Sequence, residues 1–327
     1  MRDFSYTRAS SIEDARKAAL QAGAMMLAGG TTLLDLAKCG VFEPDQVIDI
    51  SHISGLDAIT VTDKVATIGA LASMSAVADH PVILSAFPAV AQSLALAASQ
   101  QLRNMATIGG NLLQRTRCPY FRDPAAFPAC NKREPGSGCS AIGGVTRNHA
   151  VLGTSEHCIA TYPGDLAVAL VAFDATVDLG ARKVSVEDFF LEPGDTPDRE
   201  TVIAPGEMIM GISIPASAAA RSSTYLKVRD RQSYEFAAAS AAVGLELEAD
   251  GRTVRDVRVA LGGVATKPWR VRSVEQALIG QPLTVEAINS AAKLAMDKAV
   301  DHGGNHYKIE LAPRVVVRAL KSLGGLA

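Results

Sequence analysis

The chain has 327 residues, of which 48% are hydrophobic, 20% charged and 5% aromatic, and its formal net charge is -2. This length is sufficient for two domains that each bury a core. The nearly balanced charge excludes a protein that coats nucleic acid, because phosphate backbones attract clusters of Lys and Arg that acids do not offset. The longest apolar stretches, such as residues 89–98, are short and contain Gln92 and Ser93, so we expect no membrane span.

The first half of the chain predicts alternating helices and strands. Residues 11–22 are expected to form a helix that Ser11 caps, since acids follow Ser11 in the first turn. An apolar run at 25–28, the residues Gly29-Gly30-Thr31-Thr32 and the residues from Leu33 predict a strand, a tight turn and a helix. Further predicted elements are a strand at 47–50, a hairpin of 59–61 with 65–68, a helix at 88–102 and a second glycine turn at 107–111.

The sequence changes character between residue 115 and about residue 153. This stretch is rich in Pro, Gly, Cys and Arg and has little periodicity. It would be an improbably long structureless loop in an ordinary domain unless a metal crosslinked it. Regular elements resume with a helix at 165–172 and a strand at 175–179, and an exposed loop is expected at 192–197.

The last third predicts a second domain after a linker of small residues at 215–222. Its predicted elements are strands at 224–229, 238–248 and 253–261, and helices at 273–279, 285–301 and 309–323. Strands followed by helices indicate an α+β layer domain.

Four of the five cysteines are clustered, with the spacing C-x11-C-x8-C-x18-C, whereas Cys39 stands alone. An odd total without a secretory leader argues against a disulfide framework and favours a metal site. Structural zinc usually uses paired C-x2-4-C ligands, which are missing here, while iron–sulfur clusters tolerate wide spacings, and zinc remains the alternative. Nearby cations are expected to stabilise a negatively charged cluster: Arg115, Arg117, Arg122, Lys132, Arg133 and Arg147.

Two histidines, His149 and His157, lie in the same segment. A surface role is the simpler interpretation of both, and a role as metal ligand or as hydrogen-bond donor to a ligand is the alternative. A plain tight turn is the simpler interpretation of the first glycine turn. Together the two turns could clamp the two phosphates of a dinucleotide, because backbone N–H groups and the amino end of a helix attract anions. Neither turn matches G-x-G-x-x-G or a P-loop.

Asp165 opens a predicted helix, so it is expected either to cap that helix or to hold a diol of a ligand. Lys227 and Arg229 alternate on a predicted strand, where a solvated position is the simpler interpretation and a ligand contact the alternative. No spacing of Ser, His and Asp indicates a nucleophilic triad, and we assign no catalytic residue.

Five segments together resemble the FAD-binding subunit of the molybdenum hydroxylases, the family of xanthine dehydrogenase and aldehyde oxidoreductase. These segments, which follow one another in family order, are residues 28–33, 101–112, 162–167, 225–231 and 260–265. Residues 114–121, 130–133 and 135–139 resemble more narrowly the bacterial three-subunit aldehyde oxidoreductases whose flavin subunit also holds a [4Fe–4S] cluster.

The resemblance implies an α+β fold with two domains. Residues 1–216 would form a two-part FAD-binding domain of the PCMH or vanillyl-alcohol-oxidase-like type, with an iron–sulfur insertion at about 115–160. Residues 217–327 would form a C-terminal α+β domain of the CO-dehydrogenase flavoprotein type.

The resemblance also implies the residues that hold the cofactors. Residues 25–33 would line the FAD pyrophosphate, Asp165 would hold a hydroxyl, and Lys227 would lie near the isoalloxazine; Thr32 stands where the family most often has Asn or Asp. The implied FAD-binding residues are Met25, Met26, Leu27, Ala28, Gly29, Gly30, Thr31, Thr32, Leu33, Thr107, Gly110, Asn111, Asp165 and Lys227. The implied cluster ligands are Cys118, Cys130, Cys139 and Cys158.

The function implied by the resemblance is electron relay. A large subunit with a molybdenum cofactor would oxidise an aldehyde, a small [2Fe–2S] subunit would deliver the electrons, and FAD on this chain would pass them to a soluble acceptor. The alternatives are a self-sufficient FAD oxidase and a zinc-stapled assembly subunit without redox function. We expect a cytoplasmic location, or a periplasmic one if a signal-bearing partner carries the chain.

Overall fold

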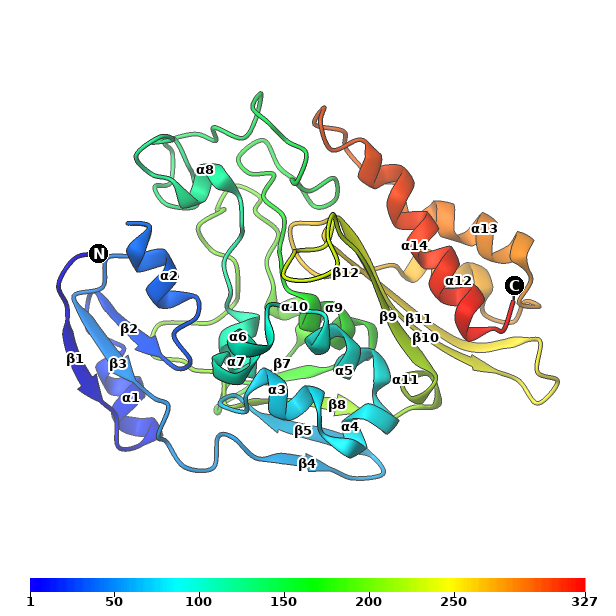
Figure 1. Ribbon diagram of the computed structural model, residues 1–327, viewed down its shortest axis with the longest axis horizontal. Helices are drawn as coiled ribbons and strands as arrows, with labels where there is room; N and C mark the ends of the chain where they lie inside the picture. The colour runs from blue at the N-terminus through cyan, green and yellow to red at the C-terminus, as the bar shows by residue number, and fades with distance from the viewer. Residues whose placement is uncertain (327) are drawn as a thin grey trace.

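The computed structural model describes residues 1–326, in which three β-sheets are combined with helices in an α+β architecture (Figure 1). The N-terminal sheet is parallel, with strand order β1-β3-β2. Its elements are β1 (Ser5–Arg8), α1 (Ile12–Ala18), β2 (Ala24–Leu27), α2 (Leu33–Lys38) and β3 (Gln46–Asp49). Ser11 caps α1 as predicted, since its hydroxyl accepts a hydrogen bond from Asp14 N at 3.1 Å, but the helix ends at Ala18 and not at Ala22.

The second sheet is antiparallel, with strand order β4-β5-β8-β6-β7, and it includes the predicted hairpin. Its strands are β4 (Ile59–Val61), β5 (Val65–Gly69), β6 (Thr176–Asp178), β7 (Lys183–Ser185) and β8 (Gly211–Pro215). The accompanying helices are α3 (Met74–Ala78), α4 (Pro81–Ala86), α5 (Pro88–Ala95), α6 (Gln100–Met105), α7 (Ile108–Leu112), α9 (Asp165–Ala172) and α10 (Val186–Phe189). The largest hydrophobic core of the chain lies between this sheet and these helices.

Two predictions for this region are wrong. Residues 88–102 form two helices because Ala98 adopts a left-handed conformation (φ 49°) and Ser99 then caps α6 by accepting a hydrogen bond from Leu102 N at 3.2 Å. The second glycine motif is not a turn between elements but the start of the short helix α7, which Thr107 caps.

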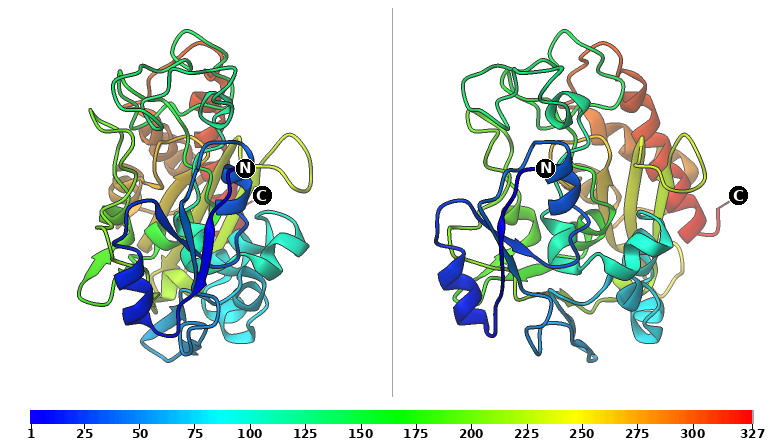
Figure 2. Two further views of the ribbon diagram at one scale, coloured as in Figure 1. Left: turned by 90° about the vertical axis from the view of Figure 1, so that its left-hand side faces the viewer. Right: turned by 60° about the vertical axis from the view of Figure 1, so that its left-hand side comes forward.

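Residues 115–160 form a loop-rich region at the top of the molecule in Figure 1 and in both views of Figure 2. The regular elements in this range are the helix α8 (Pro119–Arg122), the bridge between Cys130 and Cys139 and the bridge of Leu152 with Ala265, in agreement with the irregular segment predicted from the sequence. Thr146 fastens this region to the C-terminal part of the chain, since its hydroxyl donates to His302 O at 2.8 Å and accepts from Gly304 N at 2.9 Å.

The C-terminal sheet is antiparallel, with strand order β12-β11-β10-β9. Its elements are β9 (Ser223–Val228), β10 (Ala239–Leu247), β11 (Val254–Gly262), β12 (Trp269–Arg270), α12 (Arg272–Leu278), α13 (Val285–Lys293), the 3-10 helix η1 (Leu294–Met296) and α14 (Tyr307–Leu323). The expected helix 285–301 therefore ends early. The expected linker 215–222 contains the short helix α11 (Ala218–Arg221), whose Ala219 and Ala220 are fully buried.

The C-terminal sheet is covered on both faces. The helices α12, α13 and α14 pack on one side, and α5, α9 and α11 contact the strands from the other. Within residues 1–326, no helix is long and apolar enough to cross a membrane.

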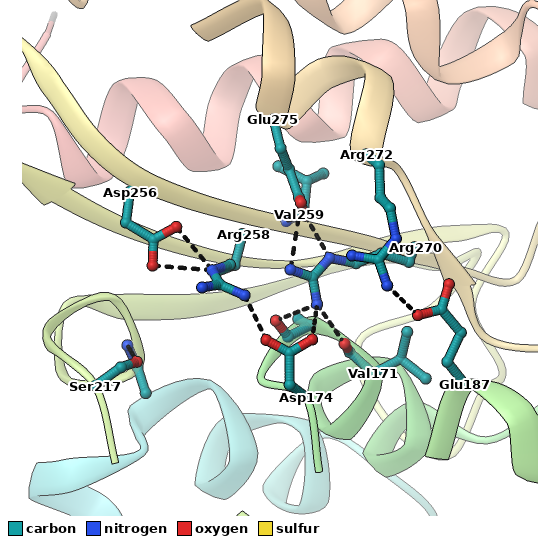
Figure 3. Close-up of polar contacts among 12 residues, drawn as sticks. Val171, Asp174, Glu187, Ser217, Asp256, Arg258, Val259, Arg270, Arg272 and Glu275 are labelled. Atoms are coloured by element: carbon teal, nitrogen blue, oxygen red, sulfur yellow. Dashed lines mark hydrogen bonds and ion pairs between the residues drawn. The ribbon is translucent and has the colours of Figure 1, made fainter. Parts of the chain in front are cut away.

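The carboxyl end of α9 is held by a buried arginine of β12, as Figure 3 shows. Arg270 Nη1 donates to Val171 O and Ala172 O, both at 2.6 Å, and its Nε pairs with Glu275 of α12. The Arg270 side chain is only 1% exposed. Because carbonyls at the end of a helix lack intrahelical donors, the guanidinium satisfies groups that α9 itself leaves open.

Candidate functional site

The first glycine motif connects β2 to α2 and lies directly against Met105 and Ala106, which precede the second motif. Gly30 adopts a left-handed conformation (φ 72°), which glycine reaches without steric cost. A Cβ on Gly29 would lie 1.8 Å from Met105 O, so only glycine permits this close approach of the two backbones. Thr32 precedes α2 without forming a side-chain capping bond, which leaves its hydroxyl available to a ligand.

The second glycine motif is the amino end of α7. The Thr107 hydroxyl accepts a hydrogen bond from Gly110 N at 3.3 Å. Asn111 contacts Met74 Sδ through Nδ2 at 3.3 Å, while its Oδ1 is buried and has no protein partner among the described residues. An unpaired buried acceptor is costly, so Asn111 Oδ1 is a candidate for contact with a ligand or water.

Both glycine motifs line one cavity of about 470 Å³, which is within the usual range for cofactor sites. The predicted residues that line it are Met25, Met26, Ala28, Gly29, Gly30, Thr31, Thr32, Leu33, Thr107 and Gly110. Leu27, Asn111, Asp165 and Lys227 do not line this cavity. We call it the glycine cavity.

Three charged residues of the glycine cavity form a network that sequence reasoning missed. Glu200 Oε1 accepts from Lys132 Nζ at 2.5 Å, and its Oε2 lies 2.5 Å from Arg115 Nε. Arg115 Nη2 is buried without a protein partner, and the guanidinium lies 5.0 Å from the centroid of the Phe121 ring. An unpaired guanidinium nitrogen at the cavity is suited to an anionic ligand. Glu200 gave no sequence signal because it follows an irregular loop.

Asp165 and Lys227 are brought together, although they come from different halves of the chain. Lys227 Nζ donates to Asp165 Oδ2 at 2.7 Å and to Leu96 O at 3.1 Å, and the Tyr225 hydroxyl donates to Asp165 Oδ1 at 2.6 Å. Burial raises the pKa of Asp165 above its ordinary value, and the charge of Lys227 opposes that rise. Asp165 therefore does not cap α9 through its side chain; it connects α9 to β9.

A second cavity of about 250 Å³ lies between Asp165 and the cysteine segment. Asp165 lines this cavity together with Cys118 and His149. Thr116 and Thr161 line both cavities, so the two are adjacent. We call it the Asp165 cavity; Lys227 lies behind Asp165 and does not line it.

The four clustered cysteines share one neighbourhood. Cys130 and Cys139 are bridged across a hairpin, and Cys118 packs against the hydrophobic groups that contain each of them. Burial, with a smaller contribution from neighbouring cysteines, raises the pKa of the Cys118 thiol to about 12 and that of the Cys158 thiol to about 11. All five cysteines of the chain are free thiols.

Within residues 1–326, no group of three or more His, Cys, Asp or Glu side chains has the geometry to hold a single metal ion. A four-iron cluster differs from a single ion because each thiolate binds a different iron, so its ligands stand further apart.

Asn131 connects the loops that carry these cysteines. Its Oδ1 accepts from Gly136 N at 3.1 Å and from Gly138 N at 2.9 Å, which closes the hairpin between Cys130 and Cys139. Its Nδ2 donates to the carbonyl of His157 at 3.0 Å, next to Cys158. These hydrogen bonds connect the hairpin of Cys130 and Cys139 to the loop that carries Cys158.

Most of the cations expected to stabilise a cluster are engaged elsewhere. Arg122 and Arg117 pair with Asp35 at 2.5 and 3.4 Å, and Arg147 pairs with Asp230 at 3.0 Å. Arg133 donates to backbone carbonyls around α8, including Phe121 O at 2.8 Å. Their principal role is therefore to tie loops together.

The two histidines of the segment differ sharply. His157 is exposed and lies 3.4 Å from Asp195, as its surface interpretation predicts. His149 is 3% exposed, and its Nε2 lies 3.2 Å from Cys118 Sγ, so the surface interpretation of His149 is wrong. Burial lowers the pKa of His149 to about 4, which leaves the imidazole neutral at neutral pH.

The glycine cavity has the size and the backbone-rich lining of a cofactor site. Residues 2–217 match the family described as FAD binding domain in molybdopterin dehydrogenase, and residues 224–323 match the CO dehydrogenase flavoprotein C-terminal domain. The chain therefore belongs to the FAD-binding subunits of the molybdenum hydroxylases, which are oxidoreductase subunits.

Relatives match over nearly the full length. The aldehyde oxidoreductase FAD-binding subunit PaoB of Escherichia coli (strain K12) is 40% identical, with 98% of each chain covered. The glyceraldehyde dehydrogenase medium chain of Sulfolobus acidocaldarius is 27% identical, again with 98% of each chain covered. A chain of the carbon monoxide dehydrogenase structure from Hydrogenophaga pseudoflava superposes with a TM-score of 0.75 at 26% identity, covering 99% of this chain and 98% of the other.

Proposed function

We propose that this chain is the flavin-bearing electron-transfer subunit of a molybdenum-dependent aldehyde oxidoreductase. The observation that carries the proposal is the 40% identity with an aldehyde oxidoreductase FAD-binding subunit along nearly the whole chain. FAD suits a relay because a flavin handles one or two electrons at a time. The protein contributes position and electrostatics.

The residues present fit FAD. The glycine cavity combines close backbone approaches at Gly29 and Gly109 with an unpaired Arg115 nitrogen that can donate to a phosphate oxygen, and the unpaired Asn111 Oδ1 can accept from a hydroxyl. We assign the phosphates to residues 25–33 with Thr107, Gly110 and Asn111. We propose that Asp165 binds a hydroxyl of the cofactor and that Lys227 keeps the Asp165 carboxylate ionised. The corresponding domain division is 1–216 and 217–327.

Cys118, Cys130, Cys139 and Cys158 are proposed to hold a [4Fe–4S] cluster beside the flavin. Support comes from their common neighbourhood and from the loops that Asn131 fixes. Of these four cysteines, Cys118 is the one that lines the Asp165 cavity. Each of these cysteines would have to lose its thiol proton to solvent on binding iron, as metal-binding cysteines do.

The proposed partners are a large subunit with a molybdenum cofactor, where the aldehyde is oxidised, and a small [2Fe–2S] subunit. Electrons leave to a soluble acceptor. The alternatives, a self-sufficient FAD oxidase and a zinc-stapled assembly subunit, lead to different measurable compositions.

The test is the anaerobic visible spectrum of the complex purified with its partners, before and after dithionite, together with iron, zinc and FAD content. We expect flavin bands on a broad iron–sulfur absorption that bleaches on reduction. If the isolated chain contained zinc and no iron, the proposed [4Fe–4S] cluster would be wrong. If the isolated chain oxidised aldehydes, the proposed role as an electron relay would be wrong. A protein that neither contains nor binds FAD would overturn the whole proposal.

A pair of cysteine variants separates the cluster from general damage. Cys158→Ser is expected to lose iron from this chain while retaining FAD. Cys39→Ser is the matched control, because Cys39 is also a free thiol but lies outside the cluster segment, after α2. Equal iron content in both variants would contradict the assignment of Cys158.

A further inference from the structure

His149 occupies a built position beside Cys118. Its Nε2 lies 3.2 Å from Cys118 Sγ, and its ring is tilted against Tyr120 with centroids 5.9 Å apart. The backbone is held on both sides, since His149 N donates to Thr146 O at 2.8 Å and Asn305 Nδ2 donates to Ala150 O at 2.9 Å. The backbone of His149 is therefore fixed, and its buried ring lies between Cys118 and Tyr120.

The proposed cluster determines which ring nitrogen of His149 carries the proton. His149 Nδ1 is buried and has no partner among the described residues. A metal-bound thiolate carries no proton, so a hydrogen bond between Nε2 and Cys118 Sγ requires that Nε2 be the donor. The neutral tautomer with its proton on Nε2 satisfies this contact.

We propose that His149 is a positioning residue of the cluster, which donates a hydrogen bond from Nε2 to Cys118 Sγ and thereby raises the reduction potential of the cluster. This inference rests on the proposed function, because it requires the [4Fe–4S] cluster. A hydrogen bond to a cluster sulfur stabilises the form with one more electron, since that form carries more negative charge. The electron arrives from an external reductant or partner centre, and no bond is made or broken at His149.

His149 contacts the one proposed cluster ligand that faces the Asp165 cavity. Cys118 and His149 both line the Asp165 cavity, whereas Cys130, Cys139 and Cys158 do not. The hydrogen bond therefore acts on Cys118, the cluster ligand at the edge of the proposed flavin site. It stabilises the reduced form of the cluster.

The experiment is an anaerobic redox titration of the purified complex with dithionite and mediators, in which reduced cluster is measured by electron paramagnetic resonance. His149→Phe removes the donor and keeps an aromatic ring, and His149→Leu serves if the larger variant does not accumulate. His149→Gln restores an N–H donor. His157→Phe is the matched control, because His157 lies in the same segment but its side chain is 49% exposed.

We expect His149→Phe and His149→Leu to retain iron and FAD while the ratio of reduced to oxidised cluster at a fixed potential falls about tenfold, or about 59 mV for one electron. His149→Gln should recover part of this shift, and His157→Phe should match the wild type. An unchanged potential in the apolar variants would overturn the inference alone, as would loss of iron in both of them and in His149→Gln. Wild-type complex without iron in this chain would instead overturn the cluster proposal and the inference with it.

Discussion

Lys227 and Asp165 form an ion pair inside the junction of the two halves of the chain. Lys227 Nζ lies 2.7 Å from Asp165 Oδ2, and the two side chains are 1% and 5% exposed. Lys227 belongs to β9, whereas Asp165 is the first residue of α9, so a C-terminal strand determines where this carboxylate lies. The Asp165 cavity thus depends on residues from both halves.

Replacing Lys227 by Met is expected to lower the free energy of unfolding by about 3–5 kcal/mol, because it leaves the buried Asp165 carboxylate unpaired. Urea unfolding measures this loss. Lys183→Met is the control, since Lys183 lies 3.9 Å from Asp178 and is 64% exposed, and we expect it to cost less than about 1 kcal/mol. If both variants lost the same free energy of unfolding, burial of the Lys227–Asp165 pair would not explain its contribution to stability.

Replacing Arg270 by Met is expected to cost about 3–5 kcal/mol as well, because Glu275 and the last carbonyls of α9 lose their donor. Arg272→Met offers a control across the same junction. Arg272 pairs with Glu187 of α10 but is 52% exposed, so we expect a change below about 1 kcal/mol. Thermal unfolding of both variants gives the comparison; a greater loss in Arg272→Met would refute it.

Replacing Gly29 by Ala is expected to abolish FAD binding, because the added Cβ would lie 1.8 Å from the Met105 carbonyl and separate the two glycine motifs. Flavin absorbance per chain measures this. Gly280→Ala tests general effects of the substitution: Gly280 has a φ of 77° but open space around it. We expect that variant to lose about 1 kcal/mol of stability and no FAD. Gly29→Ala with a full complement of FAD would disprove the expectation.

Asp49 is expected to make stability depend on pH in acid. Burial alone would raise its pKa, but hydrogen bonds from Ser51 and Tyr6 outweigh burial and lower it to about 2. A lowered pKa stabilises the folded state above the unfolded value of about 3.9 and loses this contribution as the pH falls through about 2. Asp49→Asn should therefore be less stable at pH 7 by on the order of 2 kcal/mol.

The stabilities of wild type and Asp49→Asn are expected to become more similar in acid. The difference in unfolding free energy between wild type and Asp49→Asn should shrink steadily below about pH 4. Urea titrations at pH 7, 4 and 3 measure it. A difference that stays constant over this range would show that Asp49 acts through packing and not through its charge.

The sequence predicted correctly those elements whose caps, turns and apolar patterns involve residues close together in the chain. The Ser11 cap, the hairpin from Ile59 to Ile68 and the apolar helix α9 lie where their residues indicate. The break in residues 88–102 was not predictable, because Ala98 has no intrinsic preference for its left-handed conformation and only tertiary packing imposes it.

The parts of the candidate site formed by glycine-rich backbone could be predicted from the sequence. The parts formed by side chains that are far apart in the chain could not. The glycine motifs, which the sequence marks, line one cavity. Glu200 was missed because its partner Lys132 lies 68 residues away, and no short-range pattern marks such a pair. For the same reason His149 could not be distinguished from the exposed His157.

The helix α9 links the order of synthesis to completion of the flavin site. All eight of its residues are buried, yet Lys227 anchors its first turn and Arg270 its last carbonyls. A nascent chain that has reached only residue 217 has neither anchor and leaves α9 uncovered toward the missing sheet. Although domains often fold in turn during translation, we expect this one to mature only after Arg270 has left the ribosome, with cofactor insertion following the final strand.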